Sequence, residues 1–287
     1  MIRQQINIFM KQILLPAILL AGIFNTVHAA DKIETLKICA DPFMLPFSNN
    51  EEKGYENRIA ELFAEKLGVE LQYTWFPQRM GFIRNTLKKE EGTSGKFACD
   101  LVITVPSSFE LAATTKPYYT TSYVLVFKKG TGLDDLTDPQ TFSEFAKEHK
   151  PDIKFGVSDR GPGQLWAMTQ GMMSSDHMVP YQGQPGDARV HPGQRMIEDI
   201  AAGKIDAAVI WGPTAGYYAK QFKGQHEFVL LPIPDDKSNR EMKYTYSMSM
   251  AVRYGEKEWK ETINKLIDEN SEAIDEILTD YGIPLVK

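Results

Sequence analysis

From residue 36 onward, short β-rich runs alternate with segments that have the period of an amphipathic helix. Strand-like runs at residues 36–40, 70–75 and 100–105 flank helical segments expected at 55–67 and 81–88. The first helical segment carries its apolar side chains on one face and is followed by a glycine. This order of elements is typical of α/β proteins with largely parallel sheets, so an α/β fold is expected.

The same alternation returns in the second half of the chain. Further strands are expected at 123–127, 154–157, 205–211, 228–231 and 244–253, helices at 195–202 and within the amphipathic stretch 257–281, and a surface loop at 89–98. No flexible Ser- or Pro-rich linker separates the halves. Two strands, near residues 120–128 and 244–252, are therefore expected to cross between two α/β lobes as a hinge.

The domain boundaries follow from this crossing. Lobe 1 is expected to comprise residues 30–122 and 248–287, and lobe 2 residues 123–247, with a cleft between the two lobes.

The first 29 residues are typical of a secretory signal peptide. Arg3 and Lys11 precede an apolar run at 13–24, and Val27 and Ala29 fit the positions before a cleavage site. An uncleaved anchor helix is the alternative, but the run is shorter than the ~20 residues that a membrane span needs. Cleavage after Ala29 would place the mature chain in the periplasm without a membrane span.

The chain has two cysteines, Cys39 and Cys99. An exported protein meets an oxidising compartment, where such a pair commonly forms a disulfide. Each cysteine lies at one end of a strand-like run, so neighbouring strands would bring the two sulfur atoms within reach. A disulfide is expected, and two buried free thiols are the alternative.

Charge and motifs exclude several function classes. The net charge is −6, from 32 basic and 38 acidic residues, which gives no broad basic surface for nucleic acid. Signatures for nucleotide, c-type haem, zinc-protease and serine-hydrolase sites are absent, and no cofactor or metal is expected. Soft ligands for copper gather in one segment, although packing of methionines in the core is the simpler interpretation. These residues are Met168, Met172, Met173, His177 and Met178.

Polar and aromatic residues follow several of the expected strands. In open α/β sheets, ligands bind beyond the carboxyl ends of the strands, so the loops after 36–40, 100–105 and 205–210 could face one cleft. For the aromatic residues, packing beneath a loop is an equal alternative. For the two arginines, a solvated surface position is favoured over a place in the cleft. The candidate cleft residues are Asp41, Phe43, Phe47, Glu56, Arg79, Thr104, Ser107, Ser108, Phe109, Tyr119, Arg160 and Trp211.

Several phrases of the chain carry a resemblance to a known family. They read ICADP and LPFS at 38–48, YENRIA at 55–60, PQR, GF and RNTL within 77–87, CDLV at 99–102, and WGPTAG at 211–216. In this order they resemble the MxaJ (MoxJ)/XoxJ family, periplasmic solute-binding-like proteins associated with quinoprotein alcohol dehydrogenases. The resemblance implies the two-lobe periplasmic solute-binding protein type 2 fold, with a cleft between the lobes.

The chain departs from amino-acid binders of this fold at two anchors. Where those relatives carry an arginine for the ligand carboxylate this chain has Ser108, and where they carry an aspartate for the ammonium it has Trp211. A zwitterion enclosed without such partners would leave desolvated charges unpaired. An apolar or extended ligand is therefore favoured.

The resemblance implies a non-enzymatic accessory protein of methanol oxidation. Its partner would be a PQQ-dependent methanol dehydrogenase, bound most directly through the large subunit and assisted in maturation or activity. The alternative is the solute-binding component of an ABC importer for a small, non-amino-acid, apolar ligand. A third hypothesis is an enzyme that uses Asp41, Glu56 or Glu110, but the sequence shows no paired acid and base at fixed spacing.

Overall fold

The computed structural model describes residues 33–92, 95–172, 177–183, 187, 189, 191–236 and 242–286. The expected signal peptide lies outside these residues. None of the described helices has the length and apolarity that a membrane crossing requires.

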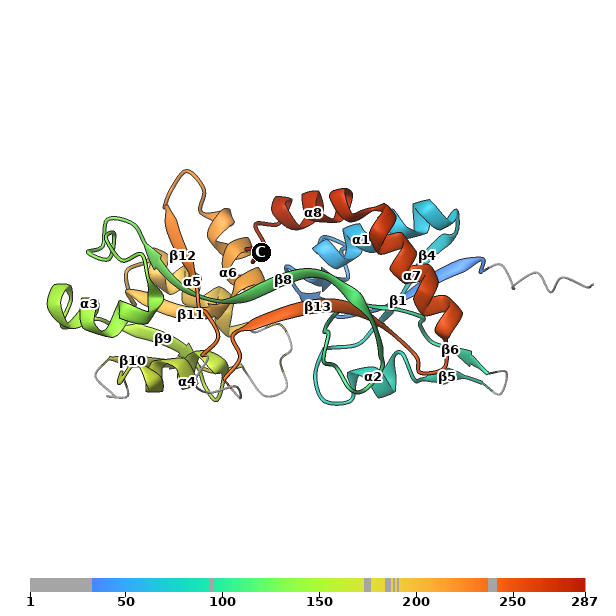
Figure 1. Cartoon of the computed structure of the whole chain (residues 1–287), viewed down its shortest axis with the longest axis horizontal. Helices are drawn as coiled ribbons and strands as arrows, with labels where there is room; N and C mark the ends of the chain where they lie inside the picture. Colours follow the sequence, from blue (N-terminus) through green and yellow to red (C-terminus); the bar gives the residue numbers. More distant parts are fainter. Residues whose placement is uncertain are drawn as a thin grey trace, which may run out of the picture. The chain divides into compact units, whose positions relative to one another are not determined.

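Lobe 1 is built around a parallel arrangement of its first strands (Figure 1). Its elements are β1 (Thr35–Ala40), β2 (Phe43–Met44), β3 (Ser48–Asn49), α1 (Tyr55–Leu67), β4 (Glu70–Trp75), α2 (Phe82–Asn85), β5 (Glu90–Glu91), β6 (Lys96–Phe97), β7 (Val102–Pro106), α7 (Lys257–Glu269) and α8 (Ser271–Asp280). Strand β1 pairs in parallel with β4, and Ile38 forms a parallel bridge with Leu101 just before β7. The parallel β-α-β order expected from the sequence is therefore present in this lobe.

Lobe 2 has helices on both faces of its sheet. Its elements are a 3-10 helix at Pro139–Thr141, α3 (Phe142–His149), β9 (Phe155–Ser158), α4 (Pro162–Thr169), β10 (Met178–Tyr181), α5 (Pro192–Ala201), β11 (Ala207–Trp211), α6 (Gly212–Gln221) and β12 (Phe228–Pro232). Strands β10, β9 and β11 are parallel neighbours. Helices α3 and α4 pack into one buried cluster, and α5 and α6 pack into the cluster on the opposite face.

Two long antiparallel strands connect the lobes, as expected. Strand β8 (Ala113–Lys128) and strand β13 (Thr245–Val252) run side by side from one lobe into the other (Figure 1). Strand β8 starts earlier than the expected 120–128. It accommodates Pro117, which has no N–H to donate, opposite Ser249 where the register shifts.

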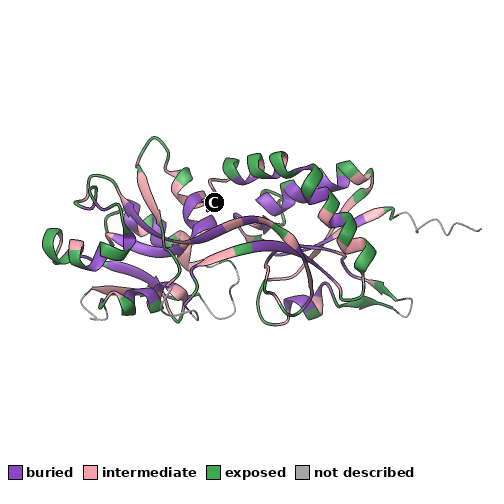
Figure 2. Cartoon of the chain, viewed as in Figure 1, coloured by how far each residue is buried: buried purple, intermediate pink, exposed green. Residues whose placement is uncertain are grey.

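Each of these two strands contributes buried side chains to the lobe 1 core at one end and to the lobe 2 core at the other. On β8, Tyr119 belongs to the lobe 1 core and Leu125 to the lobe 2 core. On β13, Met248 packs in lobe 1, whereas the preceding Tyr244 packs in lobe 2. Figure 2 shows buried residues in the strands of both lobes and exposed residues on the outer faces of the helices.

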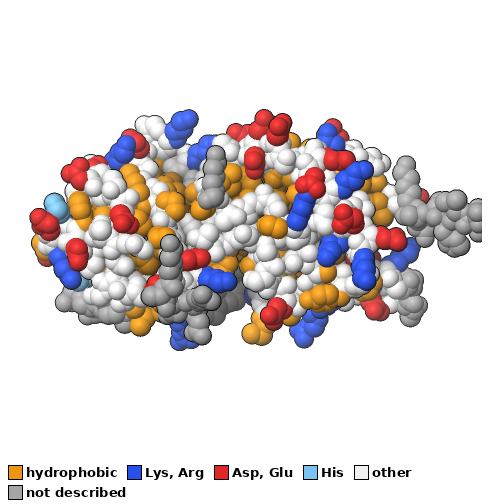
Figure 3. Space-filling model, in the orientation of Figure 1, with side chains coloured by type: hydrophobic (Ala, Val, Ile, Leu, Met, Phe, Trp, Pro, Cys, Tyr) orange, Lys and Arg blue, Asp and Glu red, His pale blue; other side chains and the backbone are white. Residues whose placement is uncertain are grey.

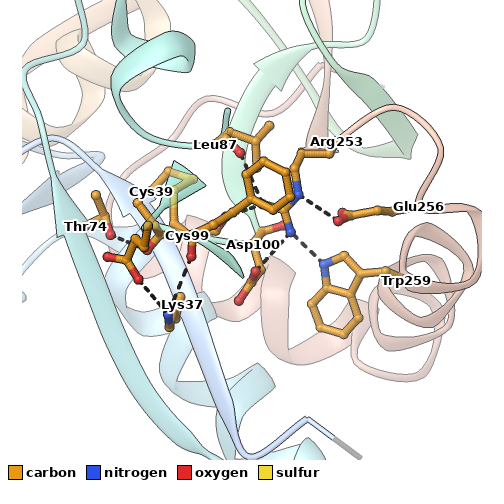
Figure 4. Close-up of polar contacts among 12 residues, drawn as sticks. Lys37, Cys39, Thr74, Leu87, Cys99, Asp100, Arg253, Glu256 and Trp259 are labelled. Carbon is orange, nitrogen blue, oxygen red and sulfur yellow. Dashed lines mark hydrogen bonds and ion pairs between the residues drawn. A yellow bond between two sulfur atoms is a disulfide. The ribbon is translucent and has the colours of Figure 1, made fainter. Parts of the chain in front are cut away.

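The Cys39–Cys99 disulfide is present, which confirms the sequence prediction. It lies where β1 and the segment before β7 run together, with the Cys39 N–H donating to the Leu101 carbonyl at 2.9 Å. Beside it, Arg253 donates to the carbonyls of Leu87 and Cys99 and pairs with Asp100 at 3.0 Å (Figure 4). This cluster attaches the end of β13 to the first strands of the lobe.

The C-terminal segment forms a third link between the lobes. After α8, the Thr121 hydroxyl donates to the Pro284 carbonyl at 2.7 Å, and the Val286 N–H donates to the Thr120 carbonyl at 2.9 Å. The same segment passes so close to α6 that a Cβ on Gly216 would lie 1.9 Å from the Gly282 oxygen. Glycine at this position lets the segment contact lobe 2.

Several local elements differ from the sequence expectation. The expected loop at 89–98 contains the β5–β6 hairpin. The amphipathic stretch 257–281 is two helices, α7 and α8, that meet at Asn270, whose side chain donates to the Leu266 carbonyl at 2.8 Å. Helices α3, α4 and α6 have no counterpart among the expected elements.

Candidate functional site

A cavity of about 560 Å³ lies between lobe 1 and lobe 2, and we call it the interlobe cavity. Lobe 1 contributes the loop after β1 and the end of β7. Lobe 2 contributes the β9–α4 loop, the start of α5 and the end of β11, while β8 and β13 supply Tyr123, Tyr246 and Met248. The volume falls in the range of small-molecule and cofactor pockets.

The lining of the interlobe cavity is largely apolar, and His191 is its one described residue with a basic side chain. None of its described lining residues is Asp, Glu, Lys or Arg. The Trp211 ring lies 5.0 Å from the Tyr123 ring and 5.6 Å from the Tyr246 ring, between centroids. Burial raises the pKa of Tyr123 to about 12, so this phenol stays uncharged at physiological pH. The wall at the end of β11 is thus a cluster of three uncharged aromatic side chains.

Asp41 positions two loops of lobe 1. Its buried carboxylate accepts the Phe43 N–H at 2.7 Å and the Gln78 N–H at 2.5 Å. The first loop carries Phe47 and the second carries Gln78, and both of these residues line the interlobe cavity. Asp41 therefore shapes the cavity without lining it.

A buried polar cluster lies beneath Thr104. The Thr104 hydroxyl is 3.2 Å from the Tyr55 hydroxyl and 2.8 Å from the Tyr118 hydroxyl, and Tyr55 and Tyr119 are joined by a hydrogen bond of 2.9 Å. These bonds satisfy buried hydroxyl groups and hold the Thr104 side chain in one orientation.

Glu56, in the first turn of α1, belongs to the same cluster. Burial raises the pKa of its carboxyl to about 7, opposed by hydrogen bonds to Thr104 and Ser48 and assisted by the nearby Asp41 carboxylate. Glu56 is only 6% exposed and is not among the residues that line the interlobe cavity. The Glu56 carboxyl therefore belongs to the buried polar cluster beneath the cavity.

Two hydrogen bonds cross from lobe 2 to the loop after β1. His191 Nε2 donates to the Phe43 carbonyl at 2.6 Å, and the Tyr218 hydroxyl donates to the Leu45 carbonyl at 3.4 Å. Both acceptors are backbone groups, so the contact depends on the path of this loop and not on the side chains it carries.

The candidate cleft residues are divided among several places. Phe47, Thr104 and Trp211 line the interlobe cavity, and Asp41, Glu56 and Tyr119 are buried next to it. Phe43 is 39% exposed and meets lobe 2 through its carbonyl group.

The remaining candidates lie outside the interlobe cavity. Ser107, Ser108 and Phe109 line a separate pocket of lobe 1, and Arg79 lines another together with Phe109. Arg160 has a positive φ of 57° and an exposed side chain, 3.9 Å from the Asp159 carboxylate.

Other lining residues were not among the sequence candidates. They are Met44, Leu45, Gln78, Pro106, Tyr123, Ser158, Gly161, Pro162, Gly163, His191, Pro192, Gly193, Met196, Val209, Ile210, Thr214, Tyr246 and Met248. Most come from turns and helix starts far apart in the sequence, where no local pattern distinguishes a lining residue from an ordinary loop residue.

The methionine-rich segment considered for copper lies in lobe 2. Met172 and Met178 pack into the lobe 2 core, and His177 Nδ1 lies 3.1 Å from the Ile153 carbonyl oxygen. Met173 is outside the described residues. Within the part of the chain that the structure describes, no three His, Cys, Asp or Glu side chains are grouped to hold a metal ion.

Comparison with known proteins gives consistent results. No family model matches the chain. The chain is 26% identical over 263 residues to protein MoxJ of Methylorubrum extorquens, covering 88% of this chain and 82% of that protein. The crystal structure of periplasmic binding protein XoxJ from Methylobacterium extorquens AM1 matches with 29% identity and a TM-score of 0.66, covering 88% of this chain and 99% of XoxJ.

A second solved structure has the same fold. The crystal structure of MxaJ from Methylophaga aminisulfidivorans matches with 23% identity and a TM-score of 0.71, over 88% of this chain and all of MxaJ. These relatives match nearly end to end, as the resemblance of the sequence phrases implied. The chain is similar to the MxaJ (MoxJ)/XoxJ proteins over nearly its whole length and has the two-lobe fold of periplasmic binding proteins.

Proposed function

We propose that this chain is a non-enzymatic, periplasmic accessory protein of methanol oxidation. In this proposal the mature chain binds a PQQ-dependent methanol dehydrogenase, most directly its large subunit, and assists the maturation or activity of that enzyme. The identity of the partner is inferred from the resemblance to the MxaJ (MoxJ)/XoxJ family. The absence of Asp, Glu, Lys and Arg from the described lining of the interlobe cavity is the observation that favours a protein ligand over an amino acid.

An amino acid would find neither the arginine nor the aspartate anchor of amino-acid binders among the described lining residues, and His191 is the one basic side chain there. The lining residues described by the structure include no Asp, Glu, Lys or Arg. Burying an unpaired carboxylate or ammonium group costs several kcal/mol. Ser108 is exposed and lines a different pocket, so it offers no replacement for the carboxylate clamp of amino-acid binders.

An extended segment of a protein suits the lining better. Trp211, Tyr123 and Tyr246 present apolar ring surface, while Gln78 and Ser158 offer polar groups that can bond to a peptide backbone. The segment would enter between the lobes, and movement about β8 and β13 would admit or release it.

The acidic side chains considered for catalysis are placed for other roles. The Asp41 carboxylate accepts hydrogen bonds from two backbone N–H groups. Glu56 lies beneath the cavity without lining it, and Glu110 is exposed at a separate pocket. These positions support binding as the activity of the chain.

The test is a binding measurement with purified proteins. Mature chain, residues 30–287, is immobilised and exposed to methanol dehydrogenase purified from the same organism. We expect wild type to bind and Trp211→Asp to bind at least about tenfold more weakly, because a carboxylate would enter an apolar wall. Ser158→Asp, at a partly exposed lining position, provides a second variant. Leu165→Asp, an exposed apolar position of α4 that does not line the cavity, is the matched control.

Solute delivery to an ABC importer is the second candidate function. The cavity volume of about 560 Å³ would accommodate a small neutral molecule. Native mass spectrometry of the purified mature chain distinguishes the two functions. A bound small molecule that Trp211→Asp releases, together with no binding to the dehydrogenase, would replace the accessory role with transport.

A further inference from the structure

A second pocket lies on lobe 1, beside the interlobe cavity. We call it the side pocket. It has a volume of about 390 Å³ and is formed by the loop from Gln78 to Gly81, helix α2 and the end of β7. Gln78 and Pro106 line both the side pocket and the interlobe cavity, so the two sites share a wall. A chain leaving the cavity over this wall would reach the side pocket.

The floor of the side pocket is apolar, and two large apolar side chains stand exposed at its rim. Phe82, Ile83 and Val105 are buried in the floor. Met80 is 100% exposed and Leu111 is 56% exposed. Apolar side chains exposed next to an apolar pocket mark interaction sites, because their burial against a partner is favourable.

The rim of the side pocket is basic. Arg79, Arg84 and Lys88 line it, and none of its described lining residues is acidic. Within the described part of the chain, Arg79 and Arg84 are exposed and make no ion pair, and Lys88 lies over the Tyr254 ring at 5.6 Å. At the lower edge of lobe 1, Figure 3 shows apolar and basic side chains together, with acidic side chains beside them.

This positive charge is unusual for the chain, whose net charge is −6. Glu110 lies between Phe109 and Leu111 and lines the neighbouring pocket with Ser107 and Arg253, and Glu90 follows Lys88 by two residues. Arg79 and Arg84, which are exposed and form no ion pair within the described part of the chain, are the cations available to an outside carboxylate.

The loop that carries Arg79 and Met80 is held in place. The Gln78 N–H donates to the Asp41 carboxylate at 2.5 Å, the Arg79 N–H to the Pro77 carbonyl at 2.8 Å, and the Phe82 N–H to the Arg79 carbonyl at 2.9 Å. A preformed site loses less conformational entropy when a partner binds.

We infer that the side pocket is a second docking site for the protein partner of the interlobe cavity. It takes a large apolar side chain flanked by aspartate or glutamate carboxylates, which pair with Arg79, Arg84 and Lys88. This inference rests on the proposed function, since the acidic segment belongs to the dehydrogenase that the cavity binds. Charge complementarity is what selects an acidic segment over a basic or neutral one.

The test compares two double variants in binding to purified methanol dehydrogenase. Arg79→Glu/Arg84→Glu reverses the charge of the rim, and Lys147→Glu/Lys223→Glu makes the same charge change at exposed positions of lobe 2. At low salt we expect the rim variant to bind at least about tenfold more weakly than wild type and the control within about twofold. The wild-type affinity should fall more steeply with added salt than the affinity of the rim variant.

A photo-crosslinking amino acid in place of Met80 provides a second measurement. Because Met80 is fully exposed, its replacement should leave the fold intact. We expect the crosslinked dehydrogenase peptide to contain an apolar residue next to Asp or Glu. A peptide without acidic residues, or no crosslink in a complex that forms, would overturn the inference.

The outcomes separate this inference from the proposed function. If wild type binds the dehydrogenase and the rim variant binds equally well, the side pocket has no role while the proposed function stands. If wild type does not bind, the proposed function fails and the inference fails with it. If both double variants weaken binding to the dehydrogenase to the same extent, the effect comes from the net charge of the protein, and the inference is overturned.

Discussion

Glu56 makes the stability of the fold depend on pH. Its pKa is raised from 4.5 to about 7, first of all because the carboxyl is buried. Between these two pH values the unfolded chain releases this proton and the folded chain keeps it, so the contribution of Glu56 to folding falls as pH rises. The loss is complete above pH 7 and amounts to about 3 kcal/mol.

Glu56→Gln isolates this effect, because glutamine resembles the protonated carboxyl and does not titrate. We subtract the free energy of unfolding of Glu56→Gln from that of wild type at each pH. We expect this difference to be about 3 kcal/mol lower at pH 8 than at pH 4.5. Urea denaturation at both pH values measures the free energies of unfolding. A difference between the two proteins that does not change with pH would show that the Glu56 carboxyl titrates normally.

Arg253 holds three segments of lobe 1 together through one guanidinium group. It donates to the Leu87 carbonyl at 3.1 Å, pairs with Glu256 at 2.7 Å and stacks over Phe97 at 4.2 Å, in addition to its bonds to Cys99 and Asp100 (Figure 4). Lysine cannot reproduce this planar set of donors. We expect Arg253→Lys to lower the free energy of unfolding by about 2–3 kcal/mol.

Arg84→Lys is the matched control for Arg253→Lys, because Arg84 is exposed and none of the described ion pairs involves it. Arg84→Lys should change the free energy of unfolding by no more than about 0.5 kcal/mol. Equal effects of the two substitutions would contradict the role assigned to Arg253.

At the scale of elements, α6 and the C-terminal segment depend on a close approach. A Cβ on Gly216 would lie 1.9 Å from the Gly282 oxygen and 3.2 Å from Pro284. We expect Gly216→Ala to destabilise the protein by about 1–3 kcal/mol or to detach the segment after α8. Hydrogen exchange of the Val286 amide, which bonds to the Thr120 carbonyl, reports detachment directly. Gln221→Ala, an exposed position of α6, is the control, and unchanged stability and exchange in Gly216→Ala would refute the contact.

The strands and the first helix could be predicted from the sequence because their patterns are local. Helix α1 carries buried Ile59 and Phe63 on one face, and Gly68 ends it in a left-handed conformation with φ of 67°. Helix α6 was missed because it begins Gly-Pro-Thr-Ala-Gly, a composition typical of loops. The break between α7 and α8 was missed because Asn270, and no proline or glycine, stands there.

The disulfide and the resemblance to the family could also be predicted, and both are confirmed. The composition of the cavity could be predicted only in part. Phe47, Thr104 and Trp211 follow strands, where ligand sites of α/β proteins lie, and all three line the interlobe cavity. His191 was missed because its contact with the Phe43 carbonyl joins residues separated by 148 positions. Such a contact exists only once the lobes are assembled.

At the scale of the whole molecule, the lobes are joined by two strands and by the C-terminal segment. Strands β8 and β13 cross together, and Thr120 and Thr121 of β8 bind the segment after α8. On the side of the interlobe cavity, the His191 and Tyr218 contacts to the loop after β1 are two hydrogen bonds to backbone carbonyls. Hydrogen bonds of this kind contribute about 1 kcal/mol each, so breaking these two would cost about 2 kcal/mol.

The central claim is that a protein segment occupies the interlobe cavity, and hydrogen exchange of the mature chain with and without purified methanol dehydrogenase tests it most directly. We expect slower exchange in the loops at 43–49 and 76–81, in the β9–α4 loop and at the start of α5, because these backbones surround the cavity. Helix α3 and the β5–β6 hairpin, which do not line the cavity, should exchange at unchanged rates. Protection confined to those two elements, or no protection anywhere in a saturated mixture, would contradict the claim.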